Sequence, residues 1–100
     1  MHRCQSHNNV TIRLPSERWG HITQNHPELA GYLYDVLETI ENPDEIRSGN
    51  AGALIATRSI ESGKVLVVVY KEVSHDDGFV ITAFLTRELK WLSKKSKLWP

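Results

Sequence analysis

Two histidines five residues apart are the side chains best suited to acid–base chemistry in this sequence. His21 and His26 lie in the segment 17–29, which also contains Arg18. Imidazole has an unperturbed pKa that allows it to take up and release a proton near neutral pH. Two imidazoles that face one cleft can act as a general base and a general acid without a cofactor. The pair therefore makes a small nuclease without a metal our first hypothesis.

The spacing leaves other roles open for both histidines. A separation of five residues does not place them on one face of a single helix. Pro27 disfavours helical geometry at His26, so the two rings would converge only at a helix end. His21 could instead be half-buried and bonded to the backbone, and His26 could cap the helix that begins at Pro27. A metal site of His21, His26 and Glu28 is a further alternative, but no His-Glu-x-x-His pattern is present and we predict no metal.

Three polar side chains on predicted strands complete the candidate catalytic set. Arg58 interrupts the apolar face of the strand 53–59, Lys71 continues one face of the strand 65–71, and Thr82 lies in the middle of a later strand. Arginine matches phosphate oxygens in a bidentate way, and lysine supplies a point charge. Thr82 could hold a phosphate oxygen or orient a histidine. Each also has an ordinary interpretation, as a cation extending from an apolar surface or as a strand-forming threonine.

The composition predicts one small domain. Apolar residues make up 40% and charged residues 24% of the 100 residues, as in folded chains generally. We expect a disordered N-terminus over 1–9, a single domain over 10–92 and a basic tail over 93–100. Cys4 is the only cysteine, so neither an internal disulfide nor a cysteine-based zinc site is available. From the polar first residues we expect no secretory signal, and the longest apolar run is too short to span a membrane, so we expect a soluble, cytoplasmic protein.

The hydrophobic pattern places the helices before a series of strands. The predicted elements, in chain order, are a strand at 10–14, helices at 17–25 and 27–41, and strands at 53–59, 65–71 and 79–85. The segments 44–50, 61–64 and 74–78 read as turns, and 90–97 as a short terminal helix. Because helices and strands segregate, we predict an α+β fold of two N-terminal helices packed on a small four-stranded antiparallel sheet.

The net charge of zero hides an uneven distribution. Residues 87–100 carry a formal charge of +4, and residues 1–86 carry −4. A basic segment with interleaved aromatic residues, here Trp91 and Trp99, can bind a nucleic-acid backbone. The alternative is that the segment is simply solvated or pairs with the acidic remainder of the chain. The predicted substrate-binding residues are Arg18, Arg87, Lys90 and Trp91.

Five sequence segments together resemble the phage-associated members of the barnase–EndoU–colicin–RelE-like nuclease group, which have the BECR fold. They are Glu-Arg-Trp-Gly-His-Ile at 17–22, His-Pro-Glu-Leu at 26–29, Asn-Pro-Asp-Glu-Ile at 42–46, Leu-Val-Val-Val-Tyr-Lys at 66–71 and Phe-Val-Ile-Thr-Ala-Phe at 79–84. The resemblance extends over most of residues 10–92. It implies one or two N-terminal helices against a four-stranded antiparallel sheet, and metal-independent RNA cleavage in a toxin or in phage conflict.

The same resemblance implies roles for the candidate residues. His21, inside the more specific segment, is the stronger acid–base candidate, and His26 is the second. Arg58 or Lys71 would stabilise the phosphorane charge, and Thr82 would assist. RNA supplies its own nucleophile, the 2′-hydroxyl, so a neutral and a protonated histidine would suffice to form a 2′,3′-cyclic phosphate.

Two other classes of function remain open. The first is a non-catalytic module of the same fold that binds RNA or protein. The second is a structural protein, or one held by an antitoxin. An active toxin would have RNA as its substrate and an antitoxin or immunity protein as its partner.

Overall fold

The structure is a computed structural model that describes residues 1–61 and 63–100. Ser62, within the predicted turn 61–64, lies outside the described residues. The elements are β1 (His2–Gln5), β2 (Thr11–Leu14), α1 (Ser16–Asn25), the 3-10 helix η1 (Pro27–Leu29), α2 (Leu33–Glu41), β3 (Glu45–Ser48), the 3-10 helix η2 (Asn50–Gly52), β4 (Leu54–Glu61), β5 (Lys64–Glu72), β6 (Gly78–Thr86), α3 (Lys90–Ser93) and β7 (Lys97–Trp99). No helix among them is long and apolar enough to cross a membrane.

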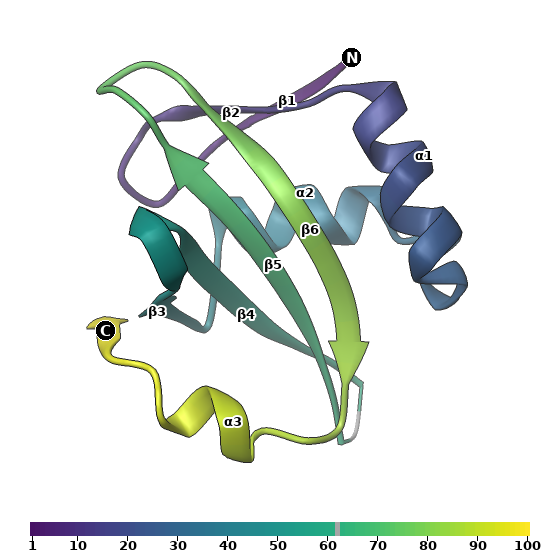
Figure 1. The fold of residues 1–100 in the computed structure, drawn as a ribbon, viewed down its shortest axis with the longest axis vertical. Helices are drawn as coiled ribbons and strands as arrows, with labels where there is room; N and C mark the ends of the chain where they lie inside the picture. Colours follow the sequence, from purple (N-terminus) through teal and green to yellow (C-terminus); the bar gives the residue numbers. More distant parts are fainter. Residues whose placement is uncertain (62) are drawn as a thin grey trace.

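The described strands form one mixed sheet of seven strands, in the order β1-β2-β6-β5-β4-β3-β7 (Figure 1). β2 and β6 run parallel, and the other neighbouring pairs are antiparallel. The predicted fold of two N-terminal helices on a four-stranded antiparallel sheet is therefore wrong. The sheet has seven strands and mixed pairing, and a third helix, α3, lies near the C-terminus.

The predicted helix over 27–41 is divided into η1 and α2. Pro27 occupies the first position of η1, where its missing N–H has no helical partner to lose. Gly31 follows with a φ of +88°, a left-handed conformation that glycine adopts without steric cost. The chain therefore turns at Gly31 and starts α2 at Leu33.

The N-terminal residues form a hairpin, so the prediction of a disordered segment over 1–9 is wrong. β1 pairs with β2, and Cys4 lies opposite Ile12 with only 6% of its surface exposed. Ser6 fixes the turn, because its hydroxyl accepts from the Val10 N–H at 3.1 Å and donates to Glu72 at 2.6 Å. The composition of the segment is polar, but these polar groups find partners within the fold.

Two short strands join the far edge of the sheet where the sequence predicts none. β3 falls in the predicted turn 44–50, and β7 falls in the predicted basic tail 93–100. Ile46 is 3% exposed and lies opposite Ala56 on one side, with Trp99 as its partner in β7 on the other. β3 has one buried residue and β7 has none, which gives too weak an alternation to be recognised in the sequence.

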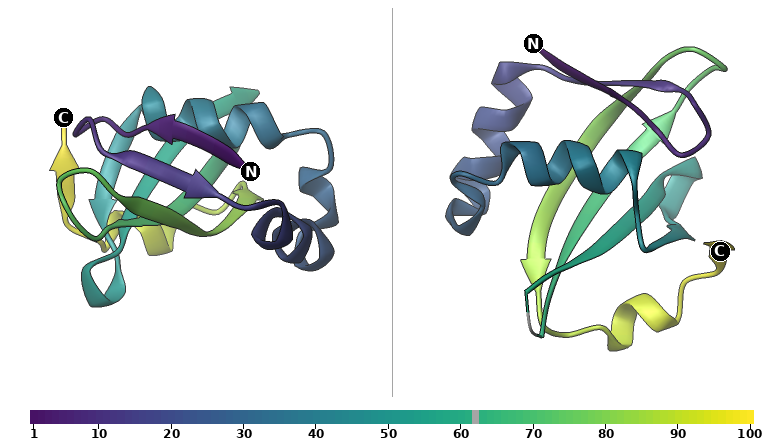
Figure 2. Two further views of the ribbon diagram at one scale, coloured as in Figure 1. Left: turned by 90° about the horizontal axis from the view of Figure 1, so that it is seen from above. Right: turned by 180° about the vertical axis from the view of Figure 1, so that it is seen from behind.

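The two faces of the sheet differ in what covers them. Leu66, Val68 and Tyr70 of β5 face the larger hydrophobic core beneath α1, η1 and α2, and we call this side the helix face. Val67 faces the opposite side, which we call the open face, and packs there in one cluster with Leu92 of α3. The short helix α3 lies near one end of the sheet (Figure 2). The central part of β5 is covered on both faces, because Leu66, Val67 and Val68 are all fully buried.

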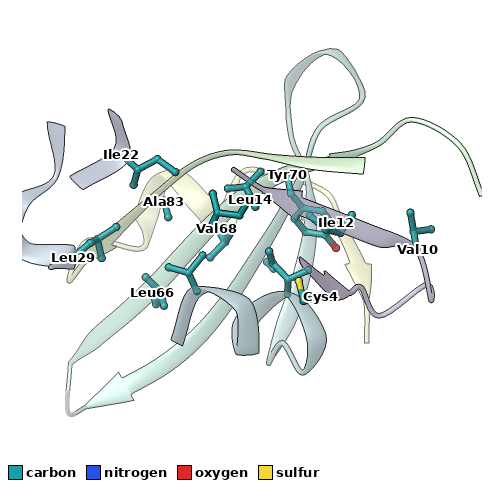
Figure 3. Packing of buried hydrophobic residues seen from close by; sticks show 14 residues of the cluster. Cys4, Val10, Ile12, Leu14, Ile22, Leu29, Leu66, Val68, Tyr70 and Ala83 are labelled. Atoms are coloured by element: carbon teal, nitrogen blue, oxygen red, sulfur yellow. The ribbon is translucent and has the colours of Figure 1, made fainter. Parts of the chain in front are cut away.

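Cys4 and Tyr70 are two titratable groups inside the core under the helix face (Figure 3). Burial, with a smaller contribution from the charge of Glu41, raises the pKa of the Cys4 thiol from its ordinary 9.0 to about 12. Burial likewise raises the pKa of the Tyr70 phenol. Both groups are therefore held in their neutral forms in the folded protein.

Stability is expected to fall as the pH rises above about 9, and Cys4 is expected to cause part of the fall. In the unfolded chain the thiol loses its proton near pH 9.0, whereas in the folded chain it keeps it up to about pH 12. Because the unfolded state binds fewer protons in this window, the free energy of unfolding decreases with pH. Urea unfolding at several pH values in the window should show a shallower decrease for Cys4→Ala. An equal slope in both proteins would contradict the assignment.

Candidate functional site

The candidate catalytic residues are divided between the two faces of the sheet. Arg58 lies opposite Leu66, which belongs to the helix face. Lys71 follows Val67 by four positions on the same strand and therefore faces the other way from Leu66. Thr82 pairs with Val69, also on the open face. Arg58 and Lys71 cannot clamp one phosphate, because the sheet separates them.

His21 lies on the exposed surface of α1. It lines a shallow hollow of about 310 Å³ together with Pro15, Glu17 and Arg18. All four residues come from α1 or the residue before it, so the hollow contains no group from the sheet. Arg18, which we predicted to bind substrate, belongs to this surface as well.

His26 lies where α1 ends and η1 begins, beside the edge of β6. Its backbone N–H donates to Ile22 O at 2.8 Å, and Pro27 follows it directly. His26 occupies the N-cap position of η1, as the alternative interpretation had it, but its side chain makes no capping hydrogen bond. Instead, its Nδ1 lies 3.6 Å from Glu28 Oε2, and 35% of the side chain is exposed. The carboxylate therefore faces one ring nitrogen and leaves Nε2 for another partner.

A row of three rings runs from this histidine across the open face. The His26 ring centroid lies 5.8 Å from that of Phe84, and the Phe84 centroid lies 5.8 Å from that of Trp91. Phe84 pairs with Val67, so it belongs to the open face. The Trp91 indole is fixed by the bond from its Nε1 to Glu88 O at 2.9 Å. His26 is thus joined to the open face through aromatic contacts, whereas His21 is not.

A β-bulge in β6 shapes the centre of the open face. Val69 pairs with Thr82 and Tyr70 pairs with Val80, so Ile81 is an extra residue. Ile81 lines the same groove as Val69, and Thr82 lies directly across from Val69. The Thr82 hydroxyl makes no side-chain hydrogen bond to another described residue. Bulges often re-aim side chains beside active sites, and this one brings two consecutive side chains of β6 to one face.

The groove beside the bulge is lined mainly by apolar residues, with Lys95 at one end. It has a volume of about 370 Å³, and its walls include Ile55, Val69 and Trp91. Lys95 Nζ lies 3.5 Å from Asn50 Oδ1 at one end. Lys71 also lies on the open face. No carboxylate of the described residues lies within ion-pair distance of its ammonium group.

The basic residues around α3 do not all reach the groove. Arg87 lines a separate hollow of about 230 Å³ with Glu28 and Lys64, and Lys90 is exposed on α3. Of the four residues that we predicted to bind substrate, Trp91 alone lines the groove. The structure adds Phe84 to the open face, and it adds Asn50 and Lys95 to the lining of the groove. Period-two alternation from Thr82 would have indicated Phe84, whereas nothing in the sequence pattern brings Asn50 and Lys95 together.

The described residues contain no group of three or more histidine, cysteine, aspartate or glutamate side chains that could hold a metal ion. The alternative metal site of His21, His26 and Glu28 is therefore not formed in them. Comparison with protein-family models, with curated proteins and with solved structures finds no match to this chain.

Proposed function

We propose that this chain is a metal-independent endoribonuclease whose active site lies on the open face of the sheet. The observation that supports this most strongly is the location of His26, Phe84 and Trp91 in one row, on the face that also carries Thr82 and Lys71. A proton-transfer group serves the 2′-hydroxyl, aromatic rings can stack on bases, and a cation can hold the RNA backbone.

In the proposed mechanism, His26 is the general base. Its Nε2 takes the proton of the ribose 2′-hydroxyl, while Glu28 beside Nδ1 stabilises the imidazolium that forms. The 2′-oxygen then bonds to phosphorus, and the bond from phosphorus to the 5′-oxygen breaks. The leaving 5′-oxygen takes a proton from water. The products are a 2′,3′-cyclic phosphate and a 5′-hydroxyl.

Thr82 is the proposed donor to the reacting phosphate, because it lies two positions from Phe84 on β6 and shares the open face with it. Lys71 lies four positions beyond Val67, the partner of Phe84, which is roughly 13 Å along the strand. Its ammonium is therefore proposed to hold a neighbouring phosphate of the RNA backbone. A threonine hydroxyl with no other hydrogen bond can donate to a phosphate oxygen. Arg58 and His21 have no role in this proposal, because they lie on other surfaces.

The test is cleavage of a single-stranded RNA oligonucleotide in the presence of EDTA, with a matched oligonucleotide that carries one 2′-deoxyribose. We expect cleavage at the position of the missing hydroxyl to disappear, and the cleaved RNA to end in a 2′,3′-cyclic phosphate. Equal cleavage of the two oligonucleotides, or dependence on a divalent cation, would contradict the proposal.

The second candidate function is RNA binding on the same face without cleavage. The observation in its favour is that His26 reaches the open face and His21 does not, so the two histidines predicted as base and acid are not brought together. Retention of the RNA oligonucleotide with no product at high protein concentration would support this function over the nuclease.

A further inference from the structure

We propose that the groove beside the β6 bulge is a nucleobase pocket, and that it restricts this protein to single-stranded RNA. The inference rests on the proposed function, and it assigns a ligand to a part of the open face outside the catalytic groups. The groove is defined by Ile55, Val69, Ile81, Trp91, Asn50 and Lys95.

The walls of the groove suit a flat aromatic ring. Ile55 is 4% exposed, and Val69 and Ile81 are partly buried, so the floor is apolar. Trp91 forms one side. A volume of about 370 Å³ lies within the range of small-molecule sites, which are mostly apolar with a few polar groups. A base on this floor could contact the indole of Trp91, which also packs against Phe84.

The groove is held in shape before any ligand binds. Trp91 Nε1 donates to Glu88 O at 2.9 Å, which fixes the side wall. Arg47 Nη1 donates to Lys95 O at 2.8 Å, and its Nε donates to Glu45 at 2.9 Å. Gly49 N–H donates to Ala53 O at 2.8 Å across the η2 loop. A wall that is already ordered lowers the entropy lost on binding.

The polar end of the groove matches a nucleotide in charge and in hydrogen bonding. Asn50 has one carbonyl and two N–H donors, and its Oδ1 accepts from Lys95 at 3.5 Å. Its amide nitrogen remains for an acceptor on the edge of a base. Lys95 lies beside Asn50, and the Lys71 side chain lies beside Gly52 of the same η2 loop, so both supply positive charge for the phosphates at this end. The nearby carboxylate of Glu45 is already paired with Arg47 and Lys97.

This geometry discriminates against a duplex. A base can enter the groove only if it leaves its stack, and its edge can meet Asn50 only if it is unpaired. Single-stranded RNA presents bases in this way, whereas the bases of an A-form duplex stay stacked and paired.

The experiment uses RNA hexamers with 2′-O-methyl groups, which cannot be cleaved by 2′-oxygen attack, and measures binding by fluorescence anisotropy. We expect the single strand to bind about tenfold or more tightly than the same sequence in a duplex. Ile81→Trp fills the groove and is expected to weaken single-strand binding about tenfold. Asn50→Ala, at an exposed position, is expected to weaken binding to some bases more than others. Asn42→Ala, at the exposed residue that follows α2, is the matched control and should bind normally.

The outcomes separate this inference from the proposed function. If Ile81→Trp and Asn50→Ala bind and cleave RNA like the unchanged protein while His26→Ala does not cleave, the nuclease proposal stands and the nucleobase pocket is wrong. If the hexamer binds in the groove but no RNA is ever cleaved, the pocket stands and the catalytic proposal is wrong. Equal binding of single-stranded and duplex RNA would also overturn the pocket.

Discussion

A His26→Ala variant is expected to cleave RNA about 100-fold or more slowly than the unchanged protein, because a positioned general base contributes typically 10²–10⁴-fold. His26 is the histidine whose ring packs on Phe84 of the open face, and Glu28 lies against its Nδ1. The loss should appear in the single-turnover rate at saturating protein, with RNA affinity nearly unchanged.

His21→Ala is the matched control for this experiment. His21 is exposed on α1, five residues earlier in the chain, and its hollow contains no residue of the sheet. Removal of its ring should therefore leave both folding and cleavage unchanged. Loss of cleavage in His21→Ala with full activity in His26→Ala would place the active site on the surface of α1 and contradict the proposal for the open face.

The central elements of the fold were predictable because their patterns are long. α1 is bounded by Ser16 and Pro27, and β4, β5 and β6 are long apolar segments between turns, so all four lie close to their predicted positions. The short strands β1, β3 and β7 were missed. Each has at most four residues and at most one buried side chain, so tertiary pairing rather than local pattern determines it.

The candidate site was only partly predictable, for a geometric reason. Alternation correctly assigned Lys71 to the face of Val67, and Arg58 to the face of Ala56. Both faces are apolar, however, and the pattern of one strand does not reveal its register with the next. The pairing of Arg58 with Leu66 is what separates the two cations. The bulge at Ile81 was equally hidden. An inserted residue changes the face of the sheet toward which the following side chains of β6 point, and no pattern in the sequence marks the insertion.

The junction between β2 and β6 also depends on a residue that sequence analysis placed in a turn. Gly78 is the first residue of β6, and it is buried where the parallel pairing with Ile12 meets the antiparallel pairing with Glu72. A methyl group at this position would collide with the carbonyl oxygen of Lys71, and it would lie 2.7 Å from Ile12 Cδ1 and 3.2 Å from Glu72 Cα. Two of these three atoms belong to the backbone of β5, which the sheet holds in place.

Gly78→Ala is therefore expected to lower the free energy of unfolding by about 3 kcal/mol, at the upper end of the usual range for overpacked cores. Gly20→Ala is the control, because no atom lies within 4 Å of the added methyl in α1 and alanine favours helix by about 0.5–1 kcal/mol. Urea unfolding should move the midpoint down for Gly78→Ala and up for Gly20→Ala, with similar slopes. Adding Ile12→Val to Gly78→Ala should recover only part of the loss, because the carbonyl of Lys71 still meets the methyl group. Full recovery would mean that the side chain of Ile12, not the strand backbone, causes the conflict.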